Sequence, residues 1–149
     1  PVDQVIWVAG GVGITPFLGT SLSRDPSDGP TPHLFYCVPS RFQAPAIDVL
    51  ETADREGRIH LHVYASDEKN RLEPRHVLLE TSTDHLRNAH IVMCGPDSLV
   101  TSMKSGLRTK GARHMHVEGF DMRSGFGPDM SRDIDDLVRS QLRRFASRK

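Results

Sequence analysis

Short apolar runs alternate with amphipathic segments along most of the chain. Residues 5–9 form an apolar run that ends at glycines, which is typical of a strand buried in a parallel sheet. Similar patterns predict further strands at residues 33–38, 58–65, 90–94 and 114–120. Prolines in helix-starting positions predict helices from Pro16, Pro45 and Pro74, and a fourth helix is predicted over residues 98–110.

This alternation of strands and helices predicts an α/β fold. We expect a Rossmann-like, doubly wound, five-stranded parallel sheet with right-handed crossovers and the strand order 3-2-1-4-5. In such sheets, ligands bind at the carboxyl ends of the strands where the order reverses. A ligand crevice is therefore expected at the carboxyl ends of the first and fourth strands.

Residues 131–149 differ from the preceding domain, which we place at residues 1–130. Five apolar residues fall on one helical face: Ile134, Leu137, Val138, Leu142 and Phe145. Aspartates come first in this segment and arginines follow, which suits the helix dipole. We expect a C-terminal amphipathic helix packed on its own domain. The alternative is a helix that lies on a membrane surface.

Composition narrows the class of protein. The 149 residues hold 19 Lys and Arg against 19 Asp and Glu, which argues against a globally basic nucleic-acid binder. No stretch approaches the roughly 20 apolar residues of a membrane helix, and no secretory signal is recognisable. Two cysteines, Cys37 and Cys94, cannot form a disulfide framework, so we expect a reducing, cytoplasmic compartment.

The clearest candidate site is the glycine-rich segment after the first strand. Gly10, Gly11 and Gly13 stand between the strand and a helix that Thr15 is expected to cap, with Pro16 at its first position. Main-chain amides there, with the helix N-terminus behind them, suit a pyrophosphate. The segment is neither a G-x-G-x-x-G fingerprint nor a Walker A loop. A glycine-rich connection without a ligand is the simpler alternative.

Two further segments end strands at the same expected edge. Cys94 closes the fourth strand and is followed by Gly95, Pro96 and Asp97, so it would face the same crevice. Considered alone, Cys94 is more simply a small buried side chain. Glu118 and Phe120 end the fifth strand, where a surface carboxylate and a core aromatic are the simpler interpretations.

These three segments together resemble the pyridine-nucleotide domain of the ferredoxin–NADP reductase superfamily. The resemblance covers about residues 5–123 and is greatest to ferric reductases and NADPH oxidases. It implies that the glycine-rich loop binds the dinucleotide pyrophosphate, through Gly10, Gly11, Val12, Gly13, Ile14, Thr15 and Pro16. It also implies that Cys94, followed by Gly95, Pro96 and Asp97, lies beside the nicotinamide C4, while Glu118 and Phe120 lie against the flavin. In that family the chain often ends at the aromatic residue that stacks on the flavin. In this sequence twenty-nine residues follow Phe120, so Phe120 is not a C-terminal residue here.

The charge beside the adenosine ribose selects between NADH and NADPH. A carboxylate binds the free 2′-hydroxyl and repels a 2′-phosphate, so Asp67, after the third strand, favours NADH. Ser40 and Arg41, after the second strand, could hold a phosphate. Both sets are also explained as solvated loop charges, and the balance favours NADH.

No metal site is expected. His60 and His62, like His114 and His116, are two apart on a strand and share a face, but such pairs lack a third and fourth ligand.

The expected function is that of an NAD(P)H-binding module of a ferric reductase-like flavin oxidoreductase. FAD would sit in a separate N-terminal β-barrel domain and pass electrons to iron, haem or oxygen. A haem-bearing membrane domain of the same parent protein is compatible with this, at the cytoplasmic face of the membrane. Nucleic acid is not an expected partner. One alternative is a non-catalytic nucleotide-binding regulatory or docking module that acts through its tail helix. Another is an unrelated flavodoxin-like domain in which phosphate sits on one loop and Cys94 has no role.

Overall fold

A five-stranded parallel sheet forms the centre of the protein. The computed structural model describes residues 2–118 and residue 143. The strands are β1 (Gln4–Gly10), β2 (His33–Val38), β3 (His60–Ala65), β4 (Ala89–Cys94) and β5 (His114–Val117). They lie in the order β3-β2-β1-β4-β5 and every neighbouring pair is parallel. The predicted fold class and strand order are confirmed.

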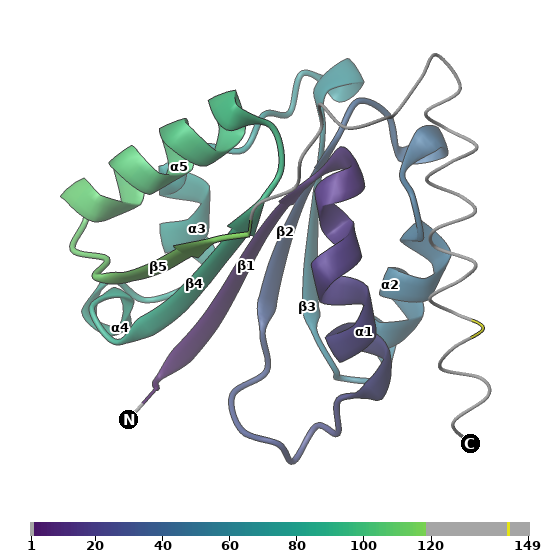
Figure 1. Cartoon of the computed structure of the whole chain (residues 1–149), viewed down its shortest axis with the longest axis horizontal. Coiled ribbons are helices and arrows are strands. Elements are labelled where there is room, and N and C mark those ends of the chain that lie inside the picture. The colour runs from purple at the N-terminus through teal and green to yellow at the C-terminus, as the bar shows by residue number, and fades with distance from the viewer. Residues whose placement is uncertain (1, 119–142, 144–149) are drawn as a thin grey trace.

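Helices cover both faces of this sheet (Figure 1). They are α1 (Thr15–Ser23), α2 (Ile47–Arg55), α3 (Pro74–Glu80), α4 (Thr83–Leu86) and α5 (Asp97–Thr109). Helices α1 and α2 lie on one face, and α3 and α5 lie on the other. Three 3-10 turns follow strands, at Gly11–Ile14, Arg41–Gln43 and Ser66–Glu68. Within the described residues, none of the helices has the length and apolar content that a membrane crossing requires.

Alternate residues of the central strand supply two separate cores. Trp7 and Ala9 of β1 point to the α1 and α2 side, where the Trp7 ring stacks on Phe17 with a centroid distance of 5.2 Å. Ile6 and Val8 point to the α3 and α5 side. All four are buried because a parallel sheet is covered on both faces. This core fixes the sheet, so its carboxyl edge is a rigid platform for the loops.

Helix starts differ from the predictions in two places. Helix α2 begins at Ile47 instead of Pro45, because Ala46 takes a left-handed conformation with φ of 58° and acts as the cap. The prediction that Thr15 caps α1 is wrong. Thr15 is the first residue of α1, and its hydroxyl donates to the Val12 carbonyl at 2.9 Å. A 3-10 turn leads directly into this helix, so the chain has no extended cap residue there.

Smaller differences concern element ends. Strand β3 begins at His60, because Arg58 leaves the sheet and donates to the Leu22 carbonyl at 2.8 Å. Helix α4 was not expected; Ser82 caps it by accepting from the Asp84 amide. Phe120 and, apart from Arg143, the predicted tail helix lie outside the described residues.

Candidate functional site

A crevice of about 550 Å³ opens at the carboxyl edge of the sheet, where the strand order reverses. It is bordered by the ends of the first four strands, the segment that leads to α3, and the first turns of α5. The lining residues are Gly10, Gly11, Cys37, Val38, Pro39, Tyr64, Ser66, Asn70, Arg71, Leu72, Glu73, Pro96, Ser98, Leu99 and Ser102. The position agrees with the prediction from strand order.

The glycine-rich turn needs its glycines for two different reasons. Gly11 has a φ of +53°, and a Cβ there would meet nothing within 4 Å, so this residue faces open space. Gly13 is the opposite case, since a Cβ would lie 2.1 Å from the Cys94 carbonyl oxygen. One glycine therefore permits an unusual backbone conformation beside the crevice, and the other permits close approach to the neighbouring strand.

A second close approach joins the same two loops. A Cβ on Gly10 would lie 2.8 Å from Pro96 and 2.7 Å from Leu99, and a Cβ on Gly95 would lie 3.0 Å from the Gly10 nitrogen. The backbones after β1 and after β4 are thus in direct contact. The structure brings the predicted Gly10–Pro16 and Cys94–Asp97 segments together as one unit.

The turn after β1 has the electrostatics of an anion site. The 3-10 turn Gly11–Ile14 runs into α1, and no acidic residue lies in the first turn of either element. Amides at the start of such helical turns carry partial positive charge. Val12 and Ile14 have buried side chains and the two glycines have none, so the turn can present only main-chain groups to a ligand. Pro16 is the second residue of α1, one position later than predicted, and Asp97 opens α5.

Cys94 lies inside the protein instead of in the wall of the crevice. Its side chain is 1% exposed and belongs to the core on the α1 side, beneath the Gly13 contact. Burial raises the pKa of the Cys94 thiol, and the nearby Glu118 carboxylate raises it further. Glu118 is exposed, its amide donates to the Met93 carbonyl at 2.8 Å, and its carboxylate lies 3.1 Å from His116 Nε2. The structure therefore brings Cys94 and Glu118 close together.

The predicted ribose-binding residues lie on neighbouring loops beside the crevice. Arg41 forms an exposed ion pair with Glu68, with Nε 3.2 Å from the carboxylate. Ser40 accepts from the Phe42 amide at 3.2 Å, and the Asp67 amide donates to the Pro39 carbonyl at 3.0 Å. Ser40, Arg41 and Asp67 thus belong to two connected loops. Arg41 is already paired with Glu68, a residue that was not among the predicted site residues.

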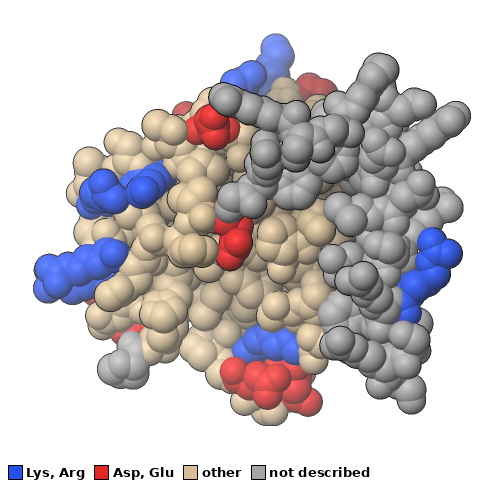
Figure 2. Space-filling model, in the orientation of Figure 1, with Lys and Arg blue, Asp and Glu red and all other residues tan. Residues whose placement is uncertain are grey.

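Several crevice residues were missed by sequence reasoning. Asn70, Arg71 and Glu73 come from the segment between β3 and α3, and Ser98 and Ser102 come from α5. Only their position just after strands at the ligand edge could have indicated them. Figure 2 shows charges of both signs scattered over one face of the molecule, so attraction of an anion depends on local groups such as these.

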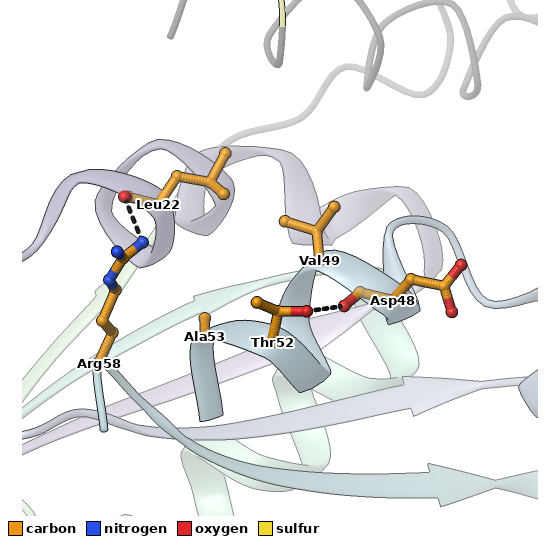
Figure 3. A pocket seen from close by; sticks show the side chains of 6 residues that line it. All are labelled: Leu22, Asp48, Val49, Thr52, Ala53 and Arg58. Atoms are coloured by element: carbon orange, nitrogen blue, oxygen red, sulfur yellow. Dashed lines mark hydrogen bonds between the residues drawn. The ribbon is translucent and has the colours of Figure 1, made fainter. Parts of the chain in front are cut away.

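A second, smaller hollow of about 310 Å³ lies between α1 and α2 (Figure 3). Leu22, Val49 and Ala53 supply much of its lining. The Arg58 and Thr52 side chains are used within the fold: Arg58 donates to the Leu22 carbonyl, and Thr52 donates to the Asp48 main-chain carbonyl at 2.9 Å. It has no converging free polar groups and is a weaker candidate. The described residues also contain no group of three or more side chains that could hold a metal.

Comparison with known proteins identifies the family. Residues 7–105 match the model of the oxidoreductase NAD-binding domain. The chain belongs to this family and is an NAD(P)-binding domain of the ferredoxin–NADP reductase superfamily. This agrees with a crevice at the strand ends and with glycine turns on which a nucleotide can lie.

Similar proteins include reductases of several kinds. The carnitine monooxygenase reductase subunit of Escherichia coli (strain K12) is 30% identical over 100 residues, which is 67% of this chain and 29% of that protein. Flavohemoglobin from Malassezia yamatoensis, solved with bound FAD and heme, has a TM-score of 0.63 and 22% identity over 77% of this chain and 31% of its own. The cytochrome b5 reductase domain of Ulva prolifera nitrate reductase has a TM-score of 0.64 and 17% identity over 78% and 49%.

The structural matches show a shared fold, and the sequence match is to a reductase subunit. The chain spans less than a third of that subunit and about half or less of the two solved chains. The more specific resemblance to ferric reductases stays a prediction.

Proposed function

We propose that the chain is the NAD(P)H-binding module of a flavin-dependent oxidoreductase. The dinucleotide would lie in the carboxyl-edge crevice with its pyrophosphate on the amides of the turn Gly11–Ile14. The observation that carries this proposal is the pair of interlocked turns after β1 and β4, which leave Gly11 facing open space at the crevice. Main-chain amides at the start of a helical turn are suited to a diphosphate.

The proposed task of the protein is positioning. Hydride transfer requires the nicotinamide to be held close to its acceptor with water excluded. Glu118, which is exposed just after β5, is proposed to stand beside the nicotinamide ring, and the buried Cys94 at the end of β4 is proposed to lie beneath that ring. Phe120, outside the described residues, keeps its proposed place against the flavin.

FAD would be bound by another domain of a longer protein and would accept the hydride. The relatives support this, since the flavohemoglobin structure contains FAD and the chain matches only 31% of it. Iron, haem or oxygen as final acceptor, a haem-bearing membrane domain and a place at the cytoplasmic face of the membrane belong to the same proposal.

NADH is the proposed dinucleotide. Asp67 and Glu68 lie on the loop after β3. Glu68 forms an ion pair with Arg41, the cation that would otherwise bind a 2′-phosphate. A free 2′-hydroxyl fits this acidic loop better than a phosphate.

The test is calorimetric titration of the chain with NADH and NADPH. Gly11→Glu should abolish binding because a carboxylate would project into the diphosphate position. Gly11→Gln shares the size and the backbone strain without the charge, and it should retain weaker binding. No heat with either dinucleotide up to millimolar concentrations would overturn the proposal. Equal binding by both variants and the parent would refute the placement of the diphosphate.

The role of Cys94 needs the longer, flavin-containing protein. Cys94→Ala should slow hydride transfer, measured by stopped-flow flavin reduction, more than it raises the Kd of NADH. A variant that reduces its flavin as fast as the parent would leave Cys94 as a core residue only.

A further inference from the structure

Tyr36 has a buried hydroxyl between two loops. The side chain lies on β2 with no exposed surface, in the core on the α1 side. Its hydroxyl lies 3.0 Å from the Pro45 carbonyl oxygen and 3.4 Å from the Gly11 carbonyl oxygen. Burial raises the pKa of Tyr36, so the hydroxyl keeps its proton and remains a donor. The hydroxyl has a single proton, which Pro45 accepts at the shorter distance and Gly11 shares at the longer one, and this shared donor links the two loops.

The two carbonyls belong to the two loops that border the ligand edge on the α1 side. Gly11 begins the 3-10 turn after β1. Pro45 ends the loop after β2 that contains Ser40 and Arg41, and it precedes Ala46, whose φ is 58°. Each loop has a residue with positive φ at this point. In the first loop it is Gly11, whose own carbonyl contacts the hydroxyl, and in the second it is Ala46, which follows Pro45. The hydrogen bond to Pro45 therefore lies beside Ala46, whose left-handed conformation is unfavourable for a residue with a side chain.

The direction of the Gly11 carbonyl also sets the direction of an amide. The structure contains no cis peptide bond among the described residues. In a trans peptide the carbonyl of one residue and the N–H of the next point in opposite directions. Because the Gly11 carbonyl points to the buried Tyr36 hydroxyl, the Val12 N–H points away from that hydroxyl. That is the orientation that an anion above the turn requires.

We propose that Tyr36 is a positioning residue for the dinucleotide: its hydroxyl orients the Gly11–Val12 peptide and holds the loop of Ser40 and Arg41 in the same frame. This inference rests on the proposed function. It assigns no contact between Tyr36 and the ligand, because the side chain is fully buried. The hydroxyl acts through the main chain of two loops.

The first test compares Tyr36→Phe with a matched control, Ser21→Ala, in the full 149-residue chain. Ser21 is also fully buried, and its hydroxyl donates to the Phe17 carbonyl at 2.8 Å inside α1, away from both loops. Tyr36→Phe should weaken NADH binding by about fivefold in calorimetry, the effect of one lost hydrogen bond. Ser21→Ala should leave the Kd unchanged, while thermal unfolding reports the stability lost in each. Unchanged affinity in Tyr36→Phe, or equal losses in both variants, overturns the proposal.

The second test needs no ligand. Amide hydrogen exchange should become faster at residues 11–14 and 40–46 in Tyr36→Phe and at neither segment in Ser21→Ala. Exchange that matches the parent at both segments overturns the proposal even if no dinucleotide binds. Failure of the parent chain to bind NADH and NADPH would instead refute the proposed function, so the two failures are distinguishable.

Discussion

The carboxyl and amino ends of the sheet are packed in opposite ways. At the carboxyl end, glycines bring main chains together and leave a crevice. At the amino end, side chains fill the space: the His33 ring stacks on His62, the rings of His33 and His60 lie 4.7 Å apart, and His62 stacks on Phe35. One end leaves main-chain groups at a crevice, and the other pairs the partly buried His33 and His62 imidazoles with each other.

The electrostatics of the amino end follow from this packing. His33 Nδ1 lies 3.1 Å from His62 Nε2, so one imidazole donates to the other and both rings are favoured in the neutral form. Burial, with the neighbouring imidazoles, lowers the pKa of His33 to about 4. Burial also lowers the pKa of His62, although the Glu80 and Asp54 carboxylates oppose the shift. The comparison teaches that one parallel sheet can hold a crevice at one end and packed rings at the other.

The largest expected effect concerns the close approach at the carboxyl end. Gly13→Ala would place a Cβ against the Cys94 carbonyl and should lower the free energy of unfolding by about 3 kcal/mol or more. Gly11→Ala meets open space, so only its positive φ should cost, by about 1 kcal/mol. Chemical denaturation measures both. Equal losses of unfolding free energy in the two variants would show that Gly13 does not pack closely against Cys94.

The next effect concerns the amino end. Because the pKa of folded His33 lies below its ordinary value of 6.5, the unfolded chain binds more protons as the pH falls. The free energy of unfolding should therefore decrease from about pH 6.5 towards pH 4, by about 1 kcal/mol between pH 7.5 and 5 after allowance for partial exposure. His62 acts in the same direction, and the groups that face the pair are His60, Glu80 and Asp54.

His33→Phe keeps a planar ring and removes one titrating group, so it should flatten that pH dependence in urea unfolding. A slope as steep as that of the parent would mean that folding does not lower the pKa of His33. Dinucleotide affinity should not change in this variant, because the histidines lie at the opposite end of the strands from the crevice.

The smallest effect concerns selectivity at the open end. Glu68→Gln should free Arg41 and lower the ratio of the NADPH Kd to the NADH Kd by two- to fivefold, since an exposed ion pair contributes little. Glu51→Gln on the exposed side of α2 is the matched control and should leave the ratio unchanged. A ratio that is the same in both variants would remove Arg41 from the ribose site.

The strand order and the position of the crevice were predictable, because buried runs and right-handed crossovers leave few arrangements. The shifted start of α2 was not, since nothing in the sequence marks an alanine such as Ala46 for the left-handed region. Thr15 was misassigned because a cap motif does not reveal that a 3-10 turn precedes the helix.

The wall of the crevice was only partly predictable. Gly10, Gly11 and Pro96 line it as expected, but Arg71 and Asn70 reach it because the chain returns from β3 over the sheet edge. Such contacts depend on the path of a loop, which has no periodicity to read. The burial of Cys94 depends on register: it pairs beside Ala9 and shares the face of α1.

The contact between the turns after β1 and β4 has a consequence for protein engineering. The first glycine segment could be grafted into another α/β scaffold without Gly95 and Pro96. Its main chain would then meet a neighbouring turn that does not fit it. The smallest transferable part is the pair of turns, which are far apart in the sequence and inseparable in space.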